Sequence, residues 1–252
     1  LAAAGLALAW ERMVTPGRGA GRALAAGLAL LLGAMTWTHC GMFRDDETLY
    51  RETLARNPGA WMAHYNLGCA LADLPGRETE AITQFEATLR LKPDHAGAET
   101  NLGNVLLRVP GRLPEAISHF EAALRITPGV AELHYNLASI LAKIPGREPD
   151  AIAQFEAALR ISPNVAHVHY NLGNLLLKMP GRMPEAIAHF RAAVEIDPGM
   201  AEAQNNLGIA LMSDPRNVPE GIGHLEAALR IRSDLPMARQ IIDRWHAAQR
   251  EQ

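Results

Sequence analysis

Apolar residues recur along the chain at helical spacing, in blocks that return every 35 residues. In one block Leu133, Leu137 and Leu141 are four apart, which places them on one face of a helix. A second helical stretch follows, and Ile152 and Phe155 belong to its apolar face. Prolines and glycines lie between the stretches, because Pro cannot continue a helix and Gly accepts a left-handed turn. The pattern predicts an all-α protein built from helix pairs.

The period of 35 residues indicates a repeat architecture. A chain that repeats itself at a fixed period is typical of a solenoid, in which each unit contacts mainly its neighbours. A solenoid usually works by displaying a surface, so the pattern favours binding over a reaction in an enclosed site. Three positions carry the period: Asn66, Asn101, Asn136, Asn171 and Asn206; Phe85, Phe120, Phe155 and Phe190; and Pro58, Pro93, Pro128, Pro163 and Pro198.

The motif Tyr65-Asn66-Leu67-Gly68, with Phe85 and Pro93 after it, resembles the tetratricopeptide repeat (TPR). The resemblance implies a TPR solenoid, a right-handed superhelix of helix pairs whose first helices line a concave surface. Each unit is one residue longer than the common form of 34 residues. The position that usually holds an aromatic residue early in the first helix instead holds His64, Glu99, His134, His169 and Gln204.

The same pattern divides the chain into four parts. We expect a membrane segment over residues 1–43, a half-repeat cap over 44–58, and five repeats over 59–234. A C-terminal capping helix over 235–252 should then close the array, because repeat proteins need polar ends for solubility. We expect one side of that helix to carry Met237, Ile241, Ile242 and Trp245.

The span 23–43 contains no Asp, Glu, Lys or Arg and is about long enough to cross a hydrocarbon layer of ~30 Å as a helix. We interpret it as a transmembrane helix; a buried helix or a signal peptide are the alternatives. The apolar stretch 1–10 is interpreted as the tail of another span, cut by the start of the sequence. Arg12, Arg18 and Arg22 lie between the two, which favours a cytoplasmic loop and repeats on the non-cytoplasmic side.

Composition excludes some partners. A net charge of -3 and a pI near 6.4 give no electrostatic footprint for nucleic acid. Asp45-Asp46-Glu47 is interpreted as an acidic helix start rather than a metal site. His119, His189 and His224 recur at one position of the second helix, which we interpret as a solvated face. We identify no catalytic residue, metal site or cofactor site in the chain.

The asparagine series is the main candidate site. An amide offers a donor and an acceptor, which suits the backbone of an extended peptide. The nucleocytoplasmic O-GlcNAc transferases use a similar ladder in their TPR domain to hold substrate protein, and this resemblance implies peptide binding in the concave groove. Bonds that fix one repeat on the next are the alternative role. The candidate residues are Asn66, Asn101, Asn136, Asn171 and Asn206, with Tyr65, Tyr135, Tyr170, Asn104 and Asn174 beside them.

A second resemblance lies in the junction that contains Phe43-Arg44-Asp45-Asp46-Glu47-Thr48-Leu49-Tyr50, Asn57-Pro58 and Trp61-Met62-Ala63-His64, and it covers about residues 1–70. It is similar to the corresponding segment of bacterial relatives of the TMTC-type membrane protein O-mannosyltransferases, which carry a TPR tail. This resemblance implies that the chain is the substrate-recruiting tail of a membrane glycosyltransferase whose catalytic domain lies upstream. A membrane-tethered scaffold for an envelope complex, with no enzymatic domain, is the alternative.

Overall fold

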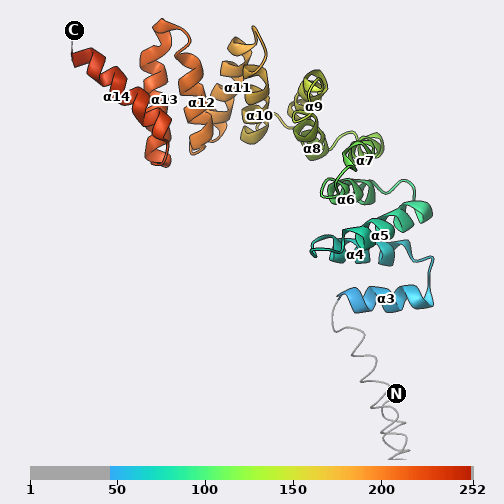
Figure 1. The fold of residues 1–252 in the computed structure, drawn as a ribbon. Coiled ribbons are helices and arrows are strands. Elements are labelled where there is room, and N and C mark those ends of the chain that lie inside the picture. Colours follow the sequence, from blue (N-terminus) through green and yellow to red (C-terminus); the bar gives the residue numbers. More distant parts are fainter. Residues whose placement is uncertain (1–45, 251–252) are drawn as a thin grey trace, which may run out of the picture. The chain divides into compact units, whose positions relative to one another are not determined.

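A computed structural model describes residues 46–250, and all regular structure in that range is helical (Figure 1). The chain divides into two compact units, the first ending at Asp94 and the second beginning at His95. The first helices of the five pairs are α4 (Trp61–Ala72), α6 (Ala96–Leu106), α8 (Ala131–Leu141), α10 (Ala166–Leu177) and α12 (Ala201–Leu211). The second helices are α5 (Glu78–Leu91), α7 (Leu113–Ile126), α9 (Glu148–Ile161), α11 (Met183–Ile196) and α13 (Val218–Ile231). The helix α3 (Asp46–Arg56) precedes these pairs and α14 (Pro236–Arg250) follows them.

The all-α prediction is therefore confirmed for the described residues, which contain twelve α-helices, one short 3₁₀ turn (Pro215–Asn217) and no strand. The predicted membrane segment, residues 1–43, lies outside the described residues. From residue 46 to residue 250, none of the helices combines the length and the apolar character that crossing a membrane requires.

The turn inside each pair explains where the second helix starts. Gly76, Gly111, Gly146 and Gly181 have φ values of 79°, 80°, 84° and 78°, so the predicted left-handed glycine is confirmed in four turns. The next residue is an arginine that reaches an acid in the first helical turn; for example, Arg112 Nε donates to Glu115 at 2.6 Å. This ion pair lowers the pKa of Glu115 below its ordinary value.

A phenylalanine from the second helix fills the core of each of the first four pairs. Phe85, Phe120, Phe155 and Phe190 are all between 0 and 1% exposed. The first helix passes close to this ring because a glycine lies opposite: a Cβ at Gly173 would lie 2.8 Å from the Phe190 ring. In the third pair Ala138 takes that place. The predicted small residues at the helix crossing thus allow the close approach of the two helices.

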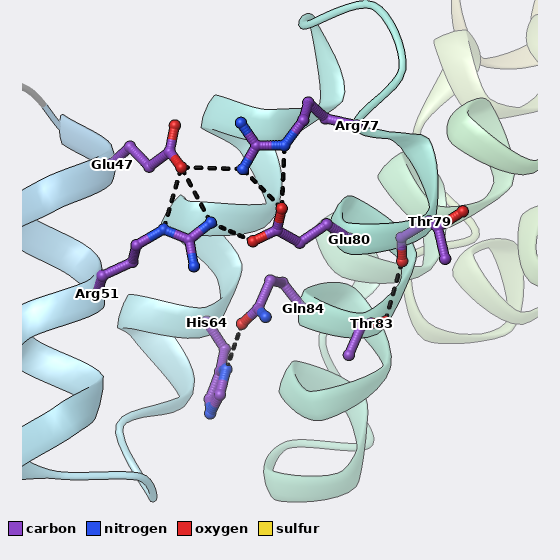
Figure 2. A network of polar contacts seen from close by, with 8 residues as sticks. All are labelled: Glu47, Arg51, His64, Arg77, Thr79, Glu80, Thr83 and Gln84. Atoms are coloured by element: carbon purple, nitrogen blue, oxygen red, sulfur yellow. Dashed lines mark hydrogen bonds and ion pairs between the residues drawn. The ribbon is translucent and has the colours of Figure 1, made fainter.

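In the first unit, α3 packs on α4 and is joined to α5 by a network of charged side chains (Figure 2). Glu47 accepts hydrogen bonds from Arg77 and Arg51, both at 2.9 Å, and Glu80 bonds the same two arginines. The hydrogen bond from Arg77 is the main reason that the pKa values of both carboxyls are lowered. Of the predicted acidic start Asp45-Asp46-Glu47, Asp46 and Glu47 lie in the first turn of α3, and Asp45 lies outside the described residues.

The last helix, α14, differs from its predicted orientation at one residue. Ala238 and Ile242 are buried against α13, while Ile241 and Trp245 are partly buried beside them. Met237 was expected on the same side and is 63% exposed, so that prediction was wrong. Ala238 and Ile242, one turn apart, define the packed face, and Met237 lies at its margin in the first turn of the helix, one turn before the partly buried Ile241.

Candidate functional site

Two polar series run along the first helices, and the first of them is bonded within each helix pair. The side chain early in the first helix meets the side chain 20 residues later on the second helix. Histidine is present in every pair, with Gln, Glu or a second His as its partner. The pairs are His64–Gln84 (2.7 Å), Glu99–His119 (2.6 Å), His134–Gln154 (2.7 Å), His169–His189 (2.9 Å) and Gln204–His224 (2.7 Å).

This pairing corrects the expectation that His119, His189 and His224 form a solvated face. All three are only partly exposed and bond the first helix of their own pair. Burial lowers the pKa values of His189 and His224, and the nearby His169 lowers that of His189 further. The polar residues that replace the usual aromatic are therefore part of the packing between helices.

The asparagine series, two residues further on, bonds between neighbouring pairs instead, and Asn171 and Asn206 have different partners. All five of its members are half-buried. Asn171 Nδ2 donates to the Tyr135 hydroxyl at 3.1 Å, and Asn206 Nδ2 donates to Asn174 Oδ1 at 2.7 Å. Both bonds join the first helices of neighbouring pairs, which is the stacking role that the sequence left open. Asn136, in contrast, makes no side-chain hydrogen bond among the described residues.

Between α8 and α10 lies a hollow of about 370 Å³, which we call the first hollow. Tyr135 and Asn171, joined by their hydrogen bond, form part of its wall. Lys143 and Lys178 follow α8 and α10 closely and are both exposed. The complete lining is Tyr135, Ser139, Ala142, Lys143, Phe155, Asn171, Asn174, Leu175 and Lys178.

A second hollow of about 330 Å³ adjoins the first, since Tyr135 lines both. Its wall is mainly apolar, and the rings of Tyr135 and His167 form a T-shaped pair with 4.7 Å between their centroids. Its lining is Ala131, Glu132, Tyr135, Asn136, Ala158, Ser162, Val165, His167 and Val168. We call the two hollows together the first-helix groove. It combines polar groups at one end with an apolar wall at the other, as ligand sites usually do.

The groove gathers some of the sequence-predicted residues and not others. Tyr135, Asn136, Asn171 and Asn174 line it, and Asn206 touches it through its bond to Asn174. Six of the predicted residues line neither hollow, and Asn206 is one of them. Asn66 and Tyr65 lie on α4 in the other unit, Tyr170 packs on Phe190, and Asn101 and Asn104 lie on α6.

Sequence reasoning missed Lys143, Lys178 and Ser139 as lining residues. A signal was present, because the chain has only three lysines and two of them are 35 residues apart. Across residues 46–250 the structure shows no group of three or more potential metal ligands.

Comparison with known proteins agrees with this fold. A family model described as tetratricopeptide repeat matches residues 43–96, 76–131, 111–166 and 146–201. No curated protein matches the chain by sequence.

Several solved structures resemble the chain. YrrB, described as a TPR protein with an unusual peptide-binding site, is 25% identical, with a TM-score of 0.63 over 76% of this chain and 96% of that one. A MamA protein is 21% identical, with a TM-score of 0.59 over 68% of this chain and 92% of that one. A MamA from Desulfovibrio magneticus RS-1 is 19% identical, with a TM-score of 0.56 over 76% and 97%. The two MamA structures support the fold alone. Because the family model covers more than half of the chain, from residue 43 to residue 201, this protein belongs to the tetratricopeptide repeat family.

Proposed function

We propose that this protein binds an extended polypeptide in the first-helix groove. TPR membership makes the chain a protein–protein interaction module, and the groove is where the described residues offer a built surface. The observation that carries the proposal is the contrast at Asn136. Its amide lines the second hollow and has no side-chain partner among the described residues, whereas the histidine series beside it is bonded in every pair.

The chemistry of the groove suits a peptide backbone. A backbone carries alternating N–H donors and C=O acceptors, and an amide side chain serves both. Asn171 donates to Tyr135, so its carbonyl oxygen remains for a peptide N–H. Each such bond contributes about 0.5–1.5 kcal/mol net, so several are needed for useful affinity.

The proposal can be tested with peptides selected from a random decapeptide phage library against the full chain. Replacing Asn136 and Asn171 together by Ala should weaken binding of a selected, fluorescently labelled peptide by about tenfold or more, if the two contacts add. Asn217→Ala, an amide outside the groove, serves as the control and should bind as the parent does. A double variant that binds normally would exclude these amides as the contacts.

The membrane context is a further part of the proposal. The uncharged span 23–43 supports a transmembrane helix, and the arginines before it support a groove on the non-cytoplasmic side. Cysteine labelling of an exposed site such as Met62→Cys in sealed vesicles tests the side. Reaction only after the cytoplasmic face is opened would contradict this topology.

The resemblance of the junction to the TMTC-type transferases supports recruitment of substrate protein to a glycosyltransferase. On that interpretation the first-helix groove holds the polypeptide while a catalytic domain elsewhere modifies it. The gene sequence upstream of Leu1 distinguishes the glycosyltransferase tail from a membrane-tethered scaffold without an enzymatic domain. Several apolar spans with an acidic pair in an early non-cytoplasmic loop support the transferase, and an initiator Met close to Leu1 supports the scaffold.

A further inference from the structure

We infer that the first hollow binds a carboxylate of the peptide and that the second hollow binds an aliphatic side chain two residues away. This inference rests on the proposed function, because it names the class of peptide that the same groove would take.

The lysines give the first hollow a positive charge. The chain has three lysines, and Lys143 and Lys178 line this one hollow. Neither makes an ion pair with an acid among the described residues, and no Asp or Glu lines the hollow. Most arginines at helix starts, by contrast, are neutralised by a neighbouring acid, as Arg182 is by Glu185. Two unneutralised ammonium groups at one hollow favour an anionic ligand.

The hydrogen bonds around the first hollow leave unused donors on two of the residues that line it. Asn205 donates to Asn206, and Asn206 donates to the carbonyl of Asn174, so the amide N–H groups of Asn174 remain. The Tyr135 hydroxyl accepts from Asn171, so its own proton remains to be donated.

One more donor belongs to the same wall. Ser139 Oγ is buried and has no hydrogen-bond partner, the one such side-chain atom among residues 46–250. Together with the two ammonium groups, these hydroxyl and amide groups make a donor set, and an ionised carboxylate is an acceptor only.

The second hollow selects a different side chain. Val165, Val168, Ala131 and Ala158 form its aliphatic wall. Glu132 also lines it and would repel a second acid. Because Tyr135 borders both hollows, one extended peptide spans them. Side chains two residues apart lie on the same face of an extended chain, roughly 7 Å from each other. The favoured ligand is thus an Asp, a Glu or a C-terminal carboxylate two residues from Leu, Ile or Val.

The test compares selections from the random decapeptide library on two forms of the full chain. Peptides selected on the parent should be enriched in Asp or Glu two residues from an aliphatic residue. Their affinity should fall with rising ionic strength, because salt screens exposed charges. Lys143→Glu/Lys178→Glu should weaken binding of the acidic peptides by at least about tenfold. A parent selection without acidic preference, or a double variant that binds as the parent does, would overturn the inference.

A matched control keeps the net charge change the same. Arg125→Glu/Arg160→Glu reverses two exposed cations, also 35 residues apart, on the second helices α7 and α9. This variant should bind the acidic peptides within about threefold of the parent, since only long-range charge differs. Equal losses in both variants would mean that overall charge, not the first hollow, attracts the peptide.

Two synthetic arms separate the sources of the carboxylate. An amidated peptide with Glu two residues after Leu tests the side chain, and a free C-terminus two residues after Leu tests the main chain. Tighter binding of either than of its Gln or amide counterpart supports the inference, and no difference in both arms overturns it. The proposed function fails separately, if no peptide is selected or if Asn136→Ala/Asn171→Ala binds normally.

Discussion

The first helices carry two polar series only two residues apart, and they have opposite surroundings. The series that includes His134 meets the second helix of its own pair in all five pairs. In the series that includes Asn136, Asn171 bonds Tyr135 and Asn206 bonds Asn174. The Asn136 side chain has no hydrogen-bond partner among the described residues. Residues two apart point to different sides of a helix. The repeated histidine contact therefore stabilises each pair, whereas the amide of Asn136 remains available to the proposed peptide.

Substitutions at the two series should separate stability from binding, and the largest expected effect on folding is at His134. His134→Ala removes contacts to Gln154 and to the Pro128 carbonyl, at 2.7 and 3.1 Å. It should lower the free energy of unfolding by about 1–3 kcal/mol, because partners are left without their hydrogen bond. Chemical denaturation followed by circular dichroism measures this loss.

Asn136→Ala is the matched variant in the same helix. It should change the free energy of unfolding by no more than about 0.5 kcal/mol, because no side-chain hydrogen bond is lost and Ala has a higher helix propensity than Asn. If Asn136→Ala is as destabilising as His134→Ala, both series are structural and the comparison fails.

An intermediate effect is expected where the asparagine series does stack neighbouring pairs. Tyr135→Phe removes the hydroxyl that accepts from Asn171 but keeps the ring between the two hollows. We expect a loss of about 0.5–1.5 kcal/mol in stability, measured by thermal melting, because one hydrogen bond is lost. A much larger loss would show that this contact holds the pairs together and that the groove is mainly structural.

The smallest effect is expected from pH, and it sharpens the comparison within the histidine series. His169 Nε2 lies 3.0 Å from the Pro163 carbonyl, which only accepts, so this nitrogen carries a proton. The neutral ring then accepts through Nδ1 from His189 Nδ1–H.

The pKa of His189 is lowered by burial and by His169, with Glu185 acting in the opposite direction and Arg182 in the same one. The unfolded chain therefore binds protons more readily, and stability should fall as the pH drops below 6.5 and be fully present above it. His189→Gln, the residue at this position in the first and third pairs, should flatten part of that slope. The remaining part of the slope should come from His224, since burial lowers its pKa as well. An unchanged slope in His189→Gln would exclude this pair as the cause.

The sequence predicted the parts of this structure that repeat. The Phe190 core position, the left-handed Gly181 and the close crossing at Gly173 follow from local chemistry that recurs every 35 residues. The right-handed sense of the superhelix and the division into cap and repeats stay predictions.

The groove could be predicted only in part. Which asparagine keeps a free amide depends on packing between neighbouring pairs, and no spacing rule distinguishes Asn136 from Asn206. The sequence shows that His, Gln and Glu alternate at two positions 20 residues apart. Only the structure shows that these two positions are hydrogen-bonded to each other within a helix pair.

The most direct test of the central claim is nuclear magnetic resonance of the side-chain amides during titration with a selected peptide. Asn136, Asn171 and Gln154 would be assigned by their single replacements with Ala. The account predicts that the Asn136 and Asn171 amide signals shift and saturate with the affinity of the peptide, while Gln154 stays in place. Shifts at Gln154 with silent asparagines would contradict it.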